Sequence, residues 1–145
     1  MDSIRKIFTA MLAIVLLTPV AAQQAEQFGK YEVHYSTLNT NMLQPEIASA
    51  YGIQRSGTRA ILNITVLDSE TGNPVQARVE AEAANLTGQR RDIQLREIRD
   101  QGAIYYLGQF RFRNEESLNF NVSIQPEGRQ GNPFSLTFRQ KFYPG

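Results

Sequence analysis

Regular alternation of apolar and polar residues is the feature that most restricts how this chain can fold. In residues 117–125, SLNFNVSIQ, four apolar residues alternate with polar ones, and residues 133–143, PFSLTFRQKFY, repeat the pattern. Successive side chains of a strand point to opposite faces, so a period of two places one set in a core and the other in water. The alternation therefore predicts β-strands with one buried face.

Further segments with strand character are separated by turn-rich sequences; they are residues 28–36, 59–69, 75–84, 91–100 and 103–114. Residues 59–69 are the most apolar, and Leu62, Ile64 and Val66 are expected on the buried face. Alanines in residues 75–84 make a helix an alternative there, but the alternation favours a strand. The chain therefore predicts an all-β fold, an immunoglobulin-like antiparallel β-sandwich of about seven strands, with a barrel as the alternative.

The first connection departs from this pattern. Residues 41–53, NMLQPEIASAYGI, place Pro45 where a helix prefers its first residue and Gly52 where a helix ends. Ile47 and Tyr51 are four residues apart and would share one helical face. We expect one short helix in this connection, at one end of the sandwich.

The start of the chain has the composition of a secretory signal. Arg5 and Lys6 precede an apolar run over residues 7–17, and small residues follow up to Ala22. The run is too short for a membrane anchor, which needs about 20 apolar residues. We expect residues 1–22 to be a cleaved signal peptide and residues 23–145 to form a single domain with no stable membrane anchor.

Charge and cysteine content narrow the possible functions. The full chain carries 15 basic and 14 acidic residues, and removal of residues 1–22 would leave 13 of each. A domain without net positive charge is poorly suited to nucleic acid, so no nucleic-acid partner is expected. The chain has no cysteine, which excludes disulfides, thiol catalysis and thiolate metal sites. No cofactor is expected.

His34 is the only histidine of the chain. It shares a strand face with Glu32 and Ser36, whereas Tyr31 and Tyr35 belong to the opposite, apolar face. A catalytic base needs both a nucleophile and an orienting group, and adjacent positions on one strand rarely supply them. A metal site is not expected, because no second histidine and no cysteine exist. We assign no catalytic residue and treat His34 as a candidate for ligand recognition.

The predicted loop after the first strand gathers polar residues at one end of the fold. Loops on a rigid sandwich often carry binding residues, although Asn and Ser in such places also simply cap helices and form turns. Together with the first strand, this loop supplies the candidate ligand-binding or partner-binding residues, which are His34, Tyr35, Asn39, Tyr51, Arg55 and Arg59.

The same region resembles a known bacterial family, domain of unknown function 4426, whose members are short exported proteins. The most specific pattern is Tyr31-x-Val33-His34-Tyr35 followed by Asn39, Leu43, Pro45, Ala48, Tyr51, Gly52 and Arg55. The resemblance extends to the ending FRQKFYPG. It implies a β-sandwich in a Gram-negative, periplasmic setting, and it supplies no catalytic residue.

The sequence thus predicts an exported, non-catalytic binding or adaptor domain whose partner is an envelope protein or a small periplasmic ligand. One alternative is a hydrolase or isomerase that depends on His34. Another is a structural subunit that joins an envelope complex by edge-strand pairing.

Overall fold

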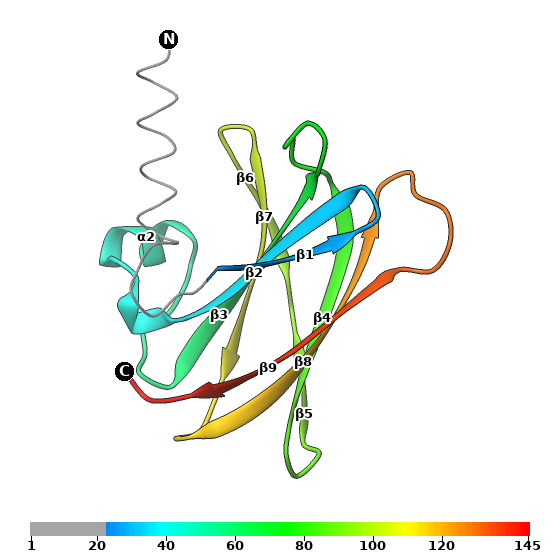
Figure 1. The fold of residues 1–145 in the computed structure, drawn as a ribbon. Helices are drawn as coiled ribbons and strands as arrows, with labels where there is room; N and C mark the ends of the chain where they lie inside the picture. The colour runs from blue at the N-terminus through cyan, green and yellow to red at the C-terminus, as the bar shows by residue number, and fades with distance from the viewer. Residues whose placement is uncertain (1–22) are drawn as a thin grey trace.

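Two antiparallel sheets face each other in the computed structural model, which describes residues 23–145 (Figure 1). Sheet A has the order β1 (Gln24–Phe28), β2 (Tyr31–Asn39), β3 (Arg59–Asp68), β7 (Ala103–Arg111) and β6 (Arg96–Asp100). Sheet B has the order β5 (Arg90–Ile93), β4 (Ala77–Asn85), β8 (Glu116–Pro126) and β9 (Phe134–Phe142). The structure therefore has the predicted all-β, immunoglobulin-like sandwich architecture.

The signal segment expected over residues 1–22 lies outside the described residues. Within residues 23–145, no helix is long and apolar enough to cross a membrane.

The predicted alternation is confirmed in the core between the sheets. On β3, Leu62, Ile64 and Val66 are each 0% exposed. They face β8, where Leu118, Phe120, Val122 and Ile124 are also buried. Burial of each such side chain contributes about 1.5–3 kcal/mol. Phe120 also stacks on Phe138 of β9 with ring centroids 4.6 Å apart, which ties the edge strand to the core.

The described residues contain nine strands, where the sequence predicted about seven. One additional strand is β1, which precedes a tight turn at Gly29 and pairs with β2. Gly29 has a φ of +57°, a backbone conformation that glycine adopts at little cost. Because β1 is mostly exposed, it lacks the apolar alternation that identifies strands in sequence.

The second difference lies in residues 91–100, which were predicted as one strand. They form the end of β5 in sheet B and all of β6 in sheet A, so the chain crosses between the sheets at residues 94 and 95. The crossing packs against Gly108 of β7, where an added Cβ would lie 2.6 Å from Ile93 Cγ2 and 2.8 Å from the Gln94 carbonyl oxygen. Only a glycine permits this close approach.

The short helix of the first connection forms as predicted, as α2 (Pro45–Ala50) after a 3₁₀ turn, η1 (Thr40–Met42). Pro45 occupies the first helical position, and Gly52 follows the helix with a φ of +65°. The segment packs on the outer face of sheet A near one end of its strands (Figure 1). Its buried side chains form a second apolar cluster with the two strands beneath; the cluster is Leu38, Leu43, Ala48, Ile53 and Ile61.

Candidate functional site

His34 projects from β2 on the outer face of sheet A, opposite to the side that packs against sheet B. Its Nε2 lies 3.0 Å from Glu32 Oε1, and the two side chains are 23% and 37% exposed. Thr65 of β3 is its direct cross-strand neighbour. The imidazole is therefore mostly covered and is oriented by a carboxylate two residues earlier on the same strand.

His34 lines a groove with a volume of about 280 Å³ on this outer face. Its floor comes from β3 and β7, and its rims come from the turns that follow β3 and precede β7. The lining residues are Gln23, His34, Thr65, Leu67, Gly72, Pro74, Gly102, Ala103, Ile104 and Tyr105. We call this the His34 groove; its walls are mainly apolar, and Gln23, His34 and Thr65 contribute polar side chains.

Tyr105 has a buried hydroxyl with no hydrogen-bond partner among the described residues. Burial, reinforced by the charges of Asp100 and Tyr51, raises the pKa of Tyr105 well above its ordinary value. The phenol therefore stays neutral and keeps its O–H as a donor. A buried polar group without a partner costs about 1–3 kcal/mol, and this oxygen is itself covered, so a molecule in the groove would reach it only if the side chain moved.

The same face contains two more buried oxygen atoms without partners in residues 23–145, Asn63 Oδ1 and Gln109 Oε1. Asn63 is only 8% exposed and is the cross-strand neighbour of Ser36. Unpaired acceptors and an unpaired phenol thus accumulate on the outer face of sheet A, between the groove and the α2 segment.

The described residues do not assemble a nucleophile with His34. Ser36 is the next outward-facing residue of β2 and is 8% exposed, but no hydrogen bond joins it to the imidazole within this part of the chain. The His34–Glu32 pair satisfies the need for an oriented base, whereas an activated nucleophile is not in contact with it.

Two of the predicted site residues, Arg55 and Asn39, bind main-chain groups. Arg55 donates from Nε to the Leu43 carbonyl at 2.9 Å and from Nη2 to the Asn41 carbonyl at 3.0 Å. Asn39 donates from Nδ2 to the Tyr143 carbonyl at 2.8 Å. These bonds fasten the α2 segment and the C-terminal segment, which gives both side chains a structural role.

The other predicted residues divide between the two faces of sheet A. Tyr51 lies close enough to Tyr105 to influence its pKa, and burial followed by Asp100 raises the pKa of Tyr51 itself. Tyr35 faces sheet B instead, with its ring 4.6 Å from that of Phe138. The structure thus brings Tyr51 to the neighbourhood of the groove and directs Tyr35 away from it.

Arg59 begins β3 and pairs in register with Arg111 of β7, away from the groove lining.

The sequence reasoning missed Tyr105 and Thr65, which both line the groove. The sequence indicated their position only in part. The strand alternation assigns both residues to outer faces, but it does not indicate that β3 and β7 are neighbours.

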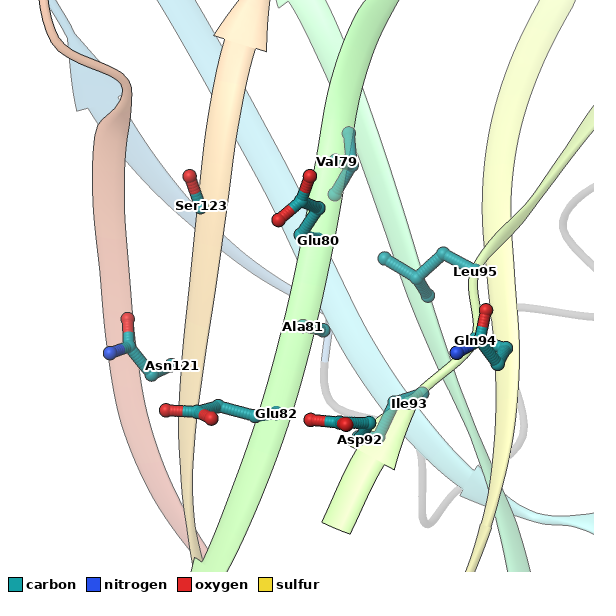
Figure 2. Close-up of a pocket in the computed structure, with 10 residues that line it drawn as sticks. All are labelled: Val79, Glu80, Ala81, Glu82, Asp92, Ile93, Gln94, Leu95, Asn121 and Ser123. Atoms are coloured by element: carbon teal, nitrogen blue, oxygen red, sulfur yellow. The ribbon is translucent and has the colours of Figure 1, made fainter. Parts of the chain in front are cut away.

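A second hollow, of about 520 Å³, lies at sheet B where β5 ends (Figure 2). Glu80 and Glu82 of β4 and Asp92 of β5 place three carboxylates around it, and no basic side chain lines it. Val79, Ile93 and Leu95 form its apolar side. Figure 2 shows Leu95 pointing back toward β4 from the segment that leaves sheet B.

A two-sheet sandwich with an outer helix over one sheet defines a class of small β-sandwich domains. Within this class the chain belongs to the family Domain of unknown function (DUF4426), whose model matches residues 25–145. The crystal structure of a DUF4426 family protein from Pseudomonas aeruginosa PAO1 is 32% identical, with a TM-score of 0.75 over 85% of this chain and 96% of that one. This finding confirms the resemblance seen in the sequence.

More distant structures share the fold alone. FetP of uropathogenic E. coli strain F11, expressed recombinantly in the E. coli periplasm, is 13% identical with a TM-score of 0.64, over 86% of this chain and 95% of that one. A copper-bound variant of FetP has the same identity and TM-score, over 86% of this chain and 97% of the variant. No curated protein sequence matches the chain.

Proposed function

We propose that this chain is an exported, periplasmic, non-catalytic binding or adaptor domain that holds a small envelope ligand in the His34 groove. The observation that carries the proposal is the mainly apolar groove in whose lining His34, oriented by Glu32, lies beside Thr65. Small-molecule sites are typically apolar hollows in which a few polar groups converge to orient the ligand.

The groove also limits the ligand. Its volume of about 280 Å³ lies just below the range typical of ligand pockets, which is about 300–1,000 Å³. A small, mainly apolar molecule with one oxygen acceptor suits it, because the Thr65 hydroxyl would donate to that oxygen while Leu67 and Pro74 contact the apolar part. His34, oriented by Glu32, offers a second hydrogen-bonding group.

A thermal-shift screen of small alcohols, ketones and short-chain acids tests the ligand site. Ala103→Leu places extra bulk in the groove lining and leaves the polar groups unchanged. Ala50→Leu makes the same change at an exposed position of α2 and serves as the matched control. Compounds that stabilise the wild type and the control but not Ala103→Leu support the proposal. Compounds that stabilise all three proteins equally contradict it.

Export rests on the signal-like sequence of residues 1–22 and on the family's exported members. Fractionation of the native host, with the intact mass of the recovered protein, tests it. We expect a periplasmic protein that begins at Gln23. A cytoplasmic protein with residues 1–22 still attached would contradict this part of the proposal.

A His34-dependent hydrolase or isomerase is the second candidate, favoured by the 3.0 Å contact between His34 Nε2 and Glu32 Oε1 in a groove wall. This function requires that the wild type hydrolyses activated esters and that the rate of the His34→Gln variant falls to background. The rate would also have to change its pH profile in Glu32→Gln, because the carboxylate orients the base. Equal background rates in all three proteins would exclude ester hydrolysis by His34.

Copper, which is bound in the FetP variant, does not fit the donors of this chain. Copper sites in proteins use several His, Cys or Met side chains. The sequence has one His and no Cys, and within residues 23–145 no three His, Cys, Asp or Glu side chains cluster around a common point. The proposed function therefore involves no copper.

A further inference from the structure

β5 covers only half of the free edge of β4 in sheet B. β5 pairs with β4 over Ala81 to Ala84, and the last pair joins Ala81 to Ile93. After Ile93 the chain leaves for sheet A, so Ala77 to Glu80 of β4 have no strand beside them on that edge (Figure 2). The hollow of about 520 Å³ occupies this place.

The backbone direction along this edge follows from two hydrogen bonds. Glu127 donates its N–H to the Gln76 carbonyl at 2.8 Å, so Gln76 and the alternate residues after it face β8. Ala77 and Val79 therefore face the open edge. The Ala77 N–H is occupied, because it donates to Tyr106 Oη at 2.8 Å. Val79 directs both its N–H and its C=O to the edge that β5 leaves uncovered.

Side chains on the two sides of this edge differ in chemistry. Val79 and Leu95 are half-buried on the core side and pack against the main core. Glu80 and Glu82 lie on the outer face, and Asp92 of β5 is beside Glu82 in register. A strand laid along this edge would therefore meet apolar groups on one side and carboxylates on the other.

We propose that the open edge of β4 accepts a short extended segment of a partner protein in which apolar and basic residues alternate. The segment's backbone would pair with Val79, its apolar residue opposite Val79 would cover Leu95, and a Lys or Arg opposite Glu80 would meet the carboxylates. Strand addition of this kind takes affinity from main-chain hydrogen bonds and specificity from alternate side chains. The Tyr106 hydroxyl limits the pairing at Ala77. Because this edge belongs to sheet B, the inference is independent of the His34 groove.

Two acetylated, amidated hexapeptides, TVKVKT and TVEVET, test the proposal in titrations of ¹⁵N-labelled protein comprising residues 23–145. We expect TVKVKT to shift the Val79 amide resonance and to slow its hydrogen exchange at least tenfold at saturation, and TVEVET to do neither. The double variant Glu80→Gln, Glu82→Gln should weaken TVKVKT binding by about fivefold, because opposite charges across a strand pair attract. Glu115→Gln, an exposed acid in another turn, should leave it unchanged.

Val79→Pro should abolish binding, because it removes the N–H that would pair with the added strand. The variant is expected to fold, because proline is tolerated at a strand edge. If this variant fails to fold, the Glu80 and Glu82 double variant still decides the matter. Equal binding of both peptides, or an unaffected Val79 amide, would overturn the proposal. Protection of Val79 that rises with protein concentration alone would assign the edge to a second copy of this chain and would also overturn it.

Discussion

Glu116 fastens the start of β8 to the β4–β5 hairpin, and its replacement gives a quantitative test of the structure. Its Oε2 accepts hydrogen bonds from Arg91 Nη2 at 2.7 Å and from Asn85 Nδ2 at 3.0 Å, and its Oε1 accepts from the Arg113 N–H at 3.0 Å. The bond from Arg91, followed by those from Arg113 and Asn85, lowers the pKa of Glu116 from 4.5 to about 2. The carboxylate is therefore strongly stabilised in its charged form.

The pKa change sets the size and the pH window of the effect. A difference of this size corresponds to about 3 kcal/mol, which we reduce to about 2 kcal/mol because water screens such pairs; the Arg91 side chain is 24% exposed. Since folding lowers the pKa, this stabilisation is complete above the unfolded-state value near 4.5 and is lost as pH falls toward about 2. Glu116→Gln should cost about 2 kcal/mol at pH 7 and less than half of that at pH 3.

Urea denaturation followed by tyrosine fluorescence or circular dichroism measures this free energy of unfolding, since the chain has no Trp and 6 Tyr. Glu115→Gln is the matched control, because it removes the same charge from the exposed neighbouring residue. A loss that is equal at pH 7 and pH 3, or a control that is equally destabilised, would refute the role assigned to Glu116.

Three other variants test the contacts around the outer face of sheet A and the β4 edge. Arg55→Ala should speed hydrogen exchange in residues 43–53 and lower stability by about 1–3 kcal/mol, because both main-chain bonds of the guanidinium are lost; unchanged exchange would contradict the anchoring role. Tyr105→Phe should leave stability unchanged or slightly raised by urea denaturation, since its buried hydroxyl has no partner in the described residues. Tyr106→Phe should instead cost about 1–3 kcal/mol, because its hydroxyl accepts from Ala77 and donates to Glu97. Equal effects of the two tyrosine variants would contradict both assignments.

The alternation of residues 117–125 and 133–143 predicted the core correctly because burial of one strand face is a local property of sequence. The boundary between β5 and β6 was not predictable in the same way. Ile93 and Leu95 both face inward, so the alternation continues across the point where the chain changes sheets. That change depends on Gly108, a residue of another strand that permits the close approach.

Only one part of the candidate site, the strand face on which His34 lies, was predictable from the sequence. The sequence assigned His34 to the face opposite Tyr31, and the structure agrees. The groove itself depends on Tyr105 and Thr65, whose proximity to His34 is set by the order of β2, β3 and β7. The polar loop pattern was recognisable, but its hydrogen bonds to main-chain carbonyls become evident only in three dimensions.

Native mass spectrometry of the protein gently isolated from the periplasm tests whether the His34 groove holds a ligand. We expect a bound small molecule on the wild type and on Ala50→Leu, and its loss from Ala103→Leu, whose added side-chain bulk lies in the His34 groove. A molecule retained equally by Ala103→Leu, or the absence of any bound molecule from all three proteins, would contradict the assignment of the His34 groove as a ligand site.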